Sequence, residues 1–244
     1  DGSLIVVSML DRKLMKISEG NLSLHSDMSH LTPFQCNDMV IAKDGTAYVG
    51  NFGADNAESN IKKTCLIAVS PEGKAKICAS DLLFPNGAVI TEDGKELIVG
   101  ETFGGTLTSF KISKPGELIN KSNWANVMPK RYQIITSIIR FLNISLKESN
   151  SVPFPVPDGI CLDADYGIWV ASPTTSEVIR YKKGGQITDR IATPNPAYAC
   201  MLGGENGKEL YILTAESSVP QFCKENKTGE IYKVSVSNER AGQP

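Results

Sequence analysis

The chain has 244 residues, of which 41% are hydrophobic and 21% are charged, and its formal net charge at pH 7 is −2. This composition is typical of a soluble globular protein with a sizeable core. A phosphate backbone needs a basic surface, which this charge balance does not supply, so we expect no nucleic-acid partner. The longest apolar stretch, residues 134–146, contains Arg140. It is shorter than the about 20 residues of a membrane span, so we expect no span either.

A unit made of a Gly-ended turn and a short apolar strand recurs along the chain. Its copies begin at Gly2, Gly45, Gly94, Gly167 and Gly207, which by subtraction are 43, 49, 73 and 40 residues apart. Most copies have one short strand before them and two after them, rich in Val, Ile and Tyr. A period of roughly 40 to 50 residues with four strands per repeat is typical of a β-propeller. The sequence therefore predicts an all-β fold, with a single propeller domain over residues 1–244 and about five blades.

The cysteines and histidines give no metal-binding pattern. The six cysteines show no C-x-x-C spacing, and four of them lie among strand-like residues. We expect reduced thiols in the core, although an even number also allows disulfides. His25 and His30 lie in a polar stretch and are expected in exposed loops. The first residues carry no secretory signal pattern, which favours a cytoplasmic location.

Small polar residues stand at one place ahead of three of the repeated units. The segments are CNDMVIAKDG, PNGAVITEDG and PDGICLDADYG, and the residues are Asn37, Asn86 and Asp158. The first strand of a blade lines the central channel, so the three side chains are expected to converge on its axis. The alternative is that each one caps a turn through a hydrogen bond to the backbone. Convergent oxygen ligands favour a divalent cation such as Ca²⁺, Mg²⁺ or Mn²⁺.

Most of the chain resembles the gluconolactonase, regucalcin and luciferin-regenerating-enzyme family of six-bladed propellers. The motifs are NDMVIAKDGTAYVGNFG, FPNGAVITEDGKELIVGET, PDGICLDADYGIWVAS, GGQITDRI, AYACMLGG and the terminal AGQP. The resemblance implies one divalent cation in the channel, held by a Glu of the first blade together with Asn86 and Asp158. It also implies that Asn37 contacts water or substrate. The ion is left open among Ca²⁺, Mn²⁺, Mg²⁺, Zn²⁺ and Fe²⁺.

Three departures from the family pattern qualify these expectations. The start of the chain resembles the family's second blade, so the first blade, its Glu ligand and one inner strand are expected to be missing, with two sheet edges exposed. Gln35 stands where sugar-lactonase members often have Arg, which weakens the expectation of a contact to an anionic group. Residues 130–150 form an insertion with apolar residues at helical spacing, which predicts an amphipathic helix. It is either a lid over the channel mouth or a helix packed on the rim or at a dimer contact.

The resemblance implies a metal-dependent lactonase that opens a sugar lactone or a small aliphatic lactone. The cation would polarise the carbonyl, and Asp158 would be the general base. The residues expected to contact the small-molecule substrate are Gln35, Asn37, Asn51, Asp55 and Glu101, and Ser172 ends a corresponding strand. Glu101 could instead be a solvated turn carboxylate. Two alternatives are a non-catalytic binding or scaffold propeller, which the missing Glu favours, and an esterase or phosphotriesterase with the same cation.

Overall fold

The computed structural model describes residues 2–54, 61–134 and 154–242, whose strands form five antiparallel sheets. The first sheet contains β1 (Leu4–Ser8), β2 (Lys13–Ser18) and β3 (Asn21–Asp27), and the second β4 (Cys36–Ile41), β5 (Ala47–Asn51), β6 (Thr64–Val69) and β7 (Ala75–Leu82). The third contains β8 (Pro85–Ile90), β9 (Glu96–Glu101), β10 (Thr106–Lys114) and β11 (Glu117–Asn126). The fourth contains β12 (Ile160–Leu162), β13 (Ile168–Ser172), β14 (Glu177–Tyr181) and β15 (Ile187–Ala192). The fifth contains β16 (Ala197–Gly203), β17 (Glu209–Thr214) and β18 (Glu230–Ser235), with the short helix α2 (Pro220–Glu225) between β17 and β18.

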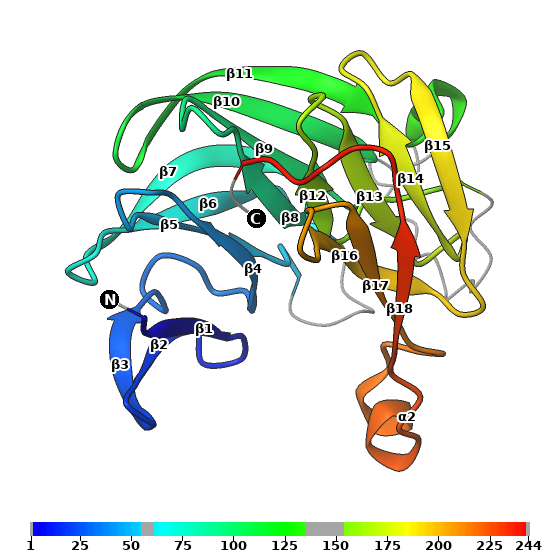
Figure 1. Ribbon diagram of the computed structural model, residues 1–244. Coiled ribbons are helices and arrows are strands. Elements are labelled where there is room, and N and C mark those ends of the chain that lie inside the picture. The colour runs from blue at the N-terminus through cyan, green and yellow to red at the C-terminus, as the bar shows by residue number, and fades with distance from the viewer. Residues whose placement is uncertain (1, 55–60, 135–153, 243–244) are drawn as a thin grey trace.

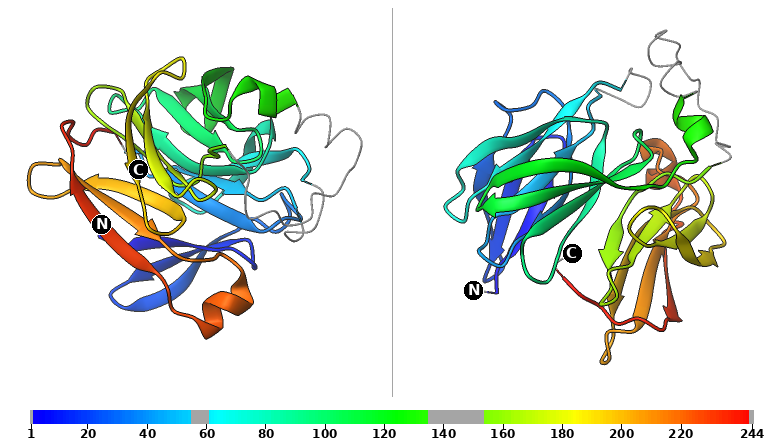
Figure 2. Two further views of the ribbon diagram at one scale, coloured as in Figure 1. Left: turned by 90° about the vertical axis from the view of Figure 1, so that its right-hand side faces the viewer. Right: turned by 90° about the horizontal axis from the view of Figure 1, so that it is seen from above.

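The five sheets are arranged side by side as the blades of a propeller (Figures 1 and 2). In each sheet the strands follow one another in chain order. The first strands of the last four blades, β4, β8, β12 and β16, are neighbours in space, so they are the inner strands. The chain is an all-β propeller with five blades, which confirms the predicted fold class. A sixth blade is not among the described residues.

The core lies in layers between successive blades, and the inner strands β8 and β12 in the middle of the row are wholly buried. Every residue of β5, β8 and β13 is buried. In contrast, the outer strands β3, β7 and β15 are mostly exposed or half-buried. One layer joins the third and fourth blades and includes Val89, Ile98, Leu107, Ile168, Val170 and Ile179. The apolar runs of three repeated units, β5, β9 and β13, are thus almost wholly buried strands, as strands covered on both faces require, whereas β1 and β17 keep exposed residues.

The first and last sheets have three strands each and lie at the two ends of the row of blades (Figure 1). Four large apolar side chains on these sheets, Leu4, Leu22, Leu24 and Ile231, are more than half exposed. The other described blades have four strands each. Most of the exposed apolar surface of the strands therefore lies at the ends of the row.

Glycine allows the inner strands of neighbouring blades to approach each other closely. A Cβ atom on Gly87 would lie 2.5 Å from the Asp158 carbonyl oxygen and 2.6 Å from the Ile160 nitrogen. A Cβ atom on Gly159 would lie 2.8 Å from the Cα atom of Ala199. Backbone atoms cannot move aside as a flexible side chain can. These two glycines therefore fix the spacing of β8, β12 and β16.

We expect Gly87→Ala to lower the free energy of unfolding by about 1–3 kcal/mol, because overpacking forces the two strands apart. Urea unfolding followed by the fluorescence of the buried Trp124 and Trp169 measures this change. Gly229→Ala is the matched control, since a Cβ atom there meets no other atom within 4 Å. Equal urea midpoints for the two variants would contradict the close approach of β8 and β12.

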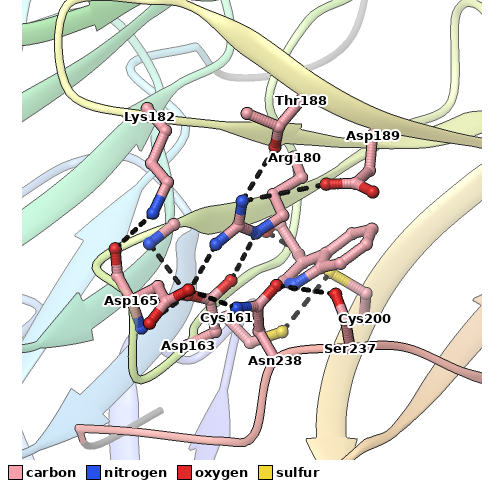
Figure 3. Close-up of polar contacts among 12 residues, drawn as sticks. Cys161, Asp163, Asp165, Arg180, Lys182, Thr188, Asp189, Cys200, Ser237 and Asn238 are labelled. Atoms are coloured by element: carbon pink, nitrogen blue, oxygen red, sulfur yellow. Dashed lines mark hydrogen bonds and ion pairs between the residues drawn. The ribbon is translucent and has the colours of Figure 1, made fainter.

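A buried ion pair holds the turn between β12 and β13 in the fourth blade (Figure 3). The Nε atom of Arg180 lies 2.6 Å from Oδ2 of Asp163, and its second terminal nitrogen donates to Oδ1 at 3.0 Å. The backbone N–H groups of Asp165 and Gly167 also donate to Oδ1. Asp163 raises the pKa of Arg180. The pair lies at the opposite end of β12 from Asp158, so its role is structural.

The cysteines and histidines match the sequence predictions in part. All six cysteines are free, which confirms the reduced thiols, and Cys36, Cys65, Cys161 and Cys200 are buried. Cys223 is exposed, so the prediction of a core position is wrong for it. His30 is exposed in a turn, but His25 lies on β3, because the polar stretch is the outer strand of a blade.

The insertion is described only at its ends. Residues 130–134 form a helical turn, and the remainder of the predicted helix lies outside the described residues. The rings of Tyr132 and Phe154 are 4.6 Å apart and pack in a cluster with Met128 and Val156. The two ends of the insertion are thereby joined beside the start of β12. Among the described residues, no helix is long and apolar enough to cross a membrane.

Candidate active site

The inner strands share an irregularity at the point where each one enters its blade. The pairing register shifts between Cys36 and Met39, between Pro85 and Ala88, and between Ala197 and Ala199. Each shift places one extra residue on the inner strand, as in a β-bulge, and bulges turn side chains in new directions. Asn37 and Asn86 occupy corresponding positions within these shifts. The two residues therefore stand at one end of the channel, which we call the channel mouth.

Asn86 and Asp158 are brought together at the channel mouth. Asp158 accepts a hydrogen bond from the Asn86 side chain. Asn86 also donates through Nδ2 to Thr102 Oγ1 at 3.1 Å, and Thr102 Oγ1 donates to the Pro157 carbonyl at 2.8 Å. The single hydroxyl proton of Thr102 is used by Pro157, so Thr102 must accept from Asn86, and this fixes the orientation of the amide. Oδ1 of Asn86 is then the atom that can bind a cation.

The carboxyl group of Asp158 is half-buried, and no opposite charge among the described residues lowers its pKa. Its burial, and then the negative charge of Asp38, raise its pKa to about 7, although hydrogen bonds from Asn86 and from the Gly159 backbone act in the opposite direction. Asp38 keeps exposed surface, yet the surrounding channel walls remove enough water that desolvation raises its pKa as well. Two carboxyl groups thus meet in one poorly hydrated place.

Asp38 is a site residue that the sequence interpretation missed. It follows Asn37 directly and occupies the position that Gly87 and Gly159 hold in the next two blades. Asn37 stands at the position of Asn86 and Asp158 ahead of its repeated unit, and Asp38 stands one residue after that position. The acidic residue in the place of a glycine was the available signal.

The other residues predicted at the site are placed as follows. Asn37 has a buried Nδ2 atom with no hydrogen-bond partner among the residues that the structure describes, so this amide is able to bind water or substrate. The backbone carbonyl of Gln35 accepts from the Phe52 N–H at 3.0 Å. Gln35 is half-buried two residues before Asn37. Asp55 lies outside the described residues.

The side chains at the ends of the second strands are bonded within their own blades. Asn51 donates to the Cys65 carbonyl at 2.9 Å and accepts from Thr64. The Glu101 carboxylate accepts from the Leu83 N–H at 2.7 Å and from the Thr108 hydroxyl, and the residue is buried, so it is not a solvated turn carboxylate. Ser172 is likewise buried and bonds to Thr175. These contacts favour a supporting role, and substrate binding by Asn51 and Glu101 stays a prediction.

Three aromatic rings lie beside the site residues. The rings of Phe52 and Phe84 are stacked at 4.6 Å, and Phe103 contacts Phe84 edge to face at 5.2 Å. Phe84 stands two residues before Asn86 and has a φ angle of 58°, which is unusual for a bulky residue. Its carbonyl accepts from the Thr102 N–H at 3.1 Å. The same loop contacts therefore position the ring stack and the Asn86 side chain.

The donor set fits a hard divalent cation. No cluster of three or more His, Cys, Asp or Glu residues suited to a metal occurs in the described parts of the chain. The available ligands are instead the Asn86 amide oxygen and the Asp158 carboxylate, which are the oxygen donors that such cations prefer. Desolvation and the negative charge of Asp38 disfavour the ionised form of Asp158 and raise its pKa, so a positive charge beside it would be stabilising. A cation at this position would supply it.

These features define a β-propeller with a polar, acidic site at the mouth of its central channel. Residues 1–216 match the family model described as SMP-30/Gluconolactonase/LRE-like region. The chain belongs to this family, which confirms the resemblance found in the sequence.

Curated relatives match over a limited stretch. Regucalcin of Xenopus laevis is 31% identical over 84 residues, which are 33% of this chain and 28% of that protein. Regucalcin of Homo sapiens is 30% identical over 84 residues, with the same shares of the two chains. The matched stretch is therefore well under a third of the length of these relatives.

Solved structures match over nearly the whole chain. A calcium-binding protein, regucalcin, from Agrobacterium tumefaciens has a TM-score of 0.72 at 17% identity. The match covers 100% of this chain and 76% of the regucalcin chain. A luciferin-regenerating enzyme has a TM-score of 0.72 at 17% identity, with 98% and 76% covered. A gluconolactonase from Xanthomonas campestris has a TM-score of 0.62 at 22% identity, with 87% and 65% covered. At these identities the likeness shows the fold.

Proposed function

We propose that this chain is a hydrolase that opens a lactone at the channel mouth with the help of one divalent cation. The observation that carries the proposal is the hydrogen-bonded pair of Asn86 and Asp158, held at the start of two neighbouring inner strands. Family membership supports the reaction type, since a gluconolactonase and regucalcins are among the similar proteins. The substrate is a sugar lactone or a small aliphatic lactone, and the ion is Ca²⁺, Mg²⁺, Mn²⁺, Zn²⁺ or Fe²⁺.

Each side chain has a distinct task in this proposal. When bound, the cation would polarise the lactone carbonyl as a Lewis acid. Asp158 and Oδ1 of Asn86 would hold it. Asp158 would also accept a proton from the attacking water as the general base. Asn37, with its unpartnered buried amide atom, would orient water or substrate.

We expect Asp158→Ala to lower kcat/KM for the best lactone by about 10²- to 10⁴-fold, because a general base and a cation ligand are removed together. A panel of sugar and aliphatic lactones is assayed with each of the five cations and again with a chelator. Glu92→Ala is the control, since Glu92 is an exposed acidic residue in the turn after β8, far along the strand from Asn86. Turnover that neither the chelator nor Asp158→Ala reduces would rule out the proposed function.

The second candidate is a non-catalytic binding propeller, and one observation favours it. The described residues contain no group of three His, Cys, Asp or Glu side chains that could hold a metal ion. Cation binding without turnover of any lactone, ester or phosphotriester would support this candidate. Turnover of an ester or phosphotriester alone would assign the same site to a related hydrolase.

A further inference from the structure

The backbone contacts that join Asn86 to Asp158 are repeated one blade further along. The residue after Asn86 donates its N–H to the Asp158 carbonyl, with the Gly87 nitrogen 3.2 Å from that oxygen. The residue after Asp158 donates its N–H to the Tyr198 carbonyl, with the Gly159 nitrogen 2.9 Å from that oxygen. The backbone of Tyr198 therefore contacts the strand of Asp158 in the same way as the backbone of Asp158 contacts the strand of Asn86.

The pairing register of the fifth blade leads to the same position. Tyr198 is the extra residue between Ala197 and Ala199, where the ladder of β16 with β17 shifts. Asn86 lies in the corresponding shift of β8. A Cβ atom on Gly159 would lie 3.0 Å from the Tyr198 carbonyl oxygen, so the two strands are in direct contact here. The Tyr198 side chain thus enters the channel mouth beside Asp158.

The surroundings of the phenol support this placement. Tyr198 is half-buried, its hydroxyl bonds to the Ser218 side chain, and it interacts electrostatically with Asp158. Ser218 precedes α2, in the loop that leaves β17 at the same end of the blade. The ordinary pKa of a tyrosine hydroxyl is about 10, so the hydroxyl keeps its proton at neutral pH. A protonated hydroxyl beside Asp158 is a hydrogen-bond donor to a bound substrate.

We propose that Tyr198 donates a hydrogen bond to the ring oxygen of the bound lactone and stabilises the negative charge that this oxygen gains as the ring opens. This inference rests on the proposed lactone hydrolysis. In that reaction, the hydroxyl of water bonds to the carbonyl carbon, and the bond from this carbon to the ring oxygen breaks. The ring oxygen keeps the electron pair and receives the remaining proton of the water. Tyr198 is unchanged at the end.

The nature of the leaving oxygen provides the test. The ring oxygen of δ-valerolactone leaves as an alkoxide, whose negative charge needs strong stabilisation. The ring oxygen of dihydrocoumarin leaves as a phenolate, whose charge needs little. We expect Tyr198→Phe to lower kcat/KM for δ-valerolactone about 10²-fold, as loss of one donor to a developing oxyanion does. For dihydrocoumarin we expect a fall of only about 3-fold or less. Each value is taken relative to the wild-type protein with the same substrate, so the difference in substrate size cancels.

Tyr211→Phe is the matched control, because Tyr211 lies in β17 of the same blade, outside the register shift, and should leave both activities unchanged. Thermal unfolding of Tyr198→Phe verifies that the fold is kept. Equal losses on both lactones, or no loss, would overturn the inference while the proposed function stands. A wild-type protein that hydrolyses no lactone of the panel, these two included, with any of the five cations would overturn both.

Discussion

Asp163→Ala is expected to lower the free energy of unfolding by about 3 kcal/mol, because the buried Arg180 guanidinium loses its closest carboxylate and keeps only Asp189, 3.7 Å away and partly exposed. The Arg180 side chain is 5% exposed and the Asp163 side chain 0%, so water cannot replace the lost carboxylate. The variant also removes the acceptor for the N–H groups of Asp165 and Gly167. A whole domain is stable by only about 5–15 kcal/mol, so this single change removes a large part of the total. The urea midpoint measures it.

A double variant separates the charge from the hydrogen bonds. Adding Arg180→Met to Asp163→Ala removes the buried cation that has lost its closest carboxylate, so the double variant should be more stable than Asp163→Ala alone. Lys114→Met is the surface control, since Lys114 and Glu117 form an ion pair at 2.9 Å with both side chains largely in solvent. It should leave the urea midpoint unchanged. A destabilisation by Asp163→Ala no larger than that of Lys114→Met would show that the pair contributes nothing.

Asp158→Asn is expected to stabilise the metal-free protein above pH 7 by up to about 4 kcal/mol, at 1.36 kcal/mol for each pKa unit. The pKa of Asp158 is about 7 in the folded protein and 3.8 for an ordinary aspartate. Between these values the native protein binds more protons than the unfolded chain, so wild-type stability falls as the pH rises from about 4 to about 7. Water that reaches the carboxylate in the channel reduces the size of the effect.

Urea unfolding at pH 4 and pH 8 in the presence of a chelator tests this sign. The gain in stability of Asp158→Asn over the wild-type protein should be present at pH 8 and absent at pH 4. Addition of a bound cation should reverse the order at pH 8, because the wild-type carboxylate then has a partner and the amide lacks its charge. An Asp158→Asn variant with the same pH profile as the wild-type protein would show that Asp158 is well hydrated in the folded state.

The sequence was sufficient to predict the blades, because the signal for each one is local. A Gly turn followed by a Val- and Ile-rich run makes a strand that must be covered on both faces, and five such runs were visible. Asn86 and Asp158 were predicted to correspond because each stands a similar number of residues ahead of the next Gly turn. The structure brings these two side chains together.

The remainder of the site depends on contacts between distant segments. Glu101 bonds to Leu83, 18 residues earlier, so nothing in its neighbours indicates that its carboxylate is already used. Asp163 and Arg180 are 17 residues apart, so no local pattern indicates that they form an ion pair. Tyr198 belongs to the channel mouth only because the register of β16 shifts, and a pattern of small polar residues could not include a tyrosine.

The repeated backbone contact between inner strands has a consequence for how such proteins diversify. Two main-chain hydrogen bonds place Asn86, Asp158 and Tyr198 in successive inner strands without using their side-chain atoms: Gly87 N–H donates to the Asp158 carbonyl and Gly159 N–H donates to the Tyr198 carbonyl. An amide, a carboxyl group and a phenol are therefore interchangeable as far as the scaffold is concerned. Evolution, or a protein engineer, can alter the reactivity of the cavity one blade at a time without redesigning the architecture that surrounds it.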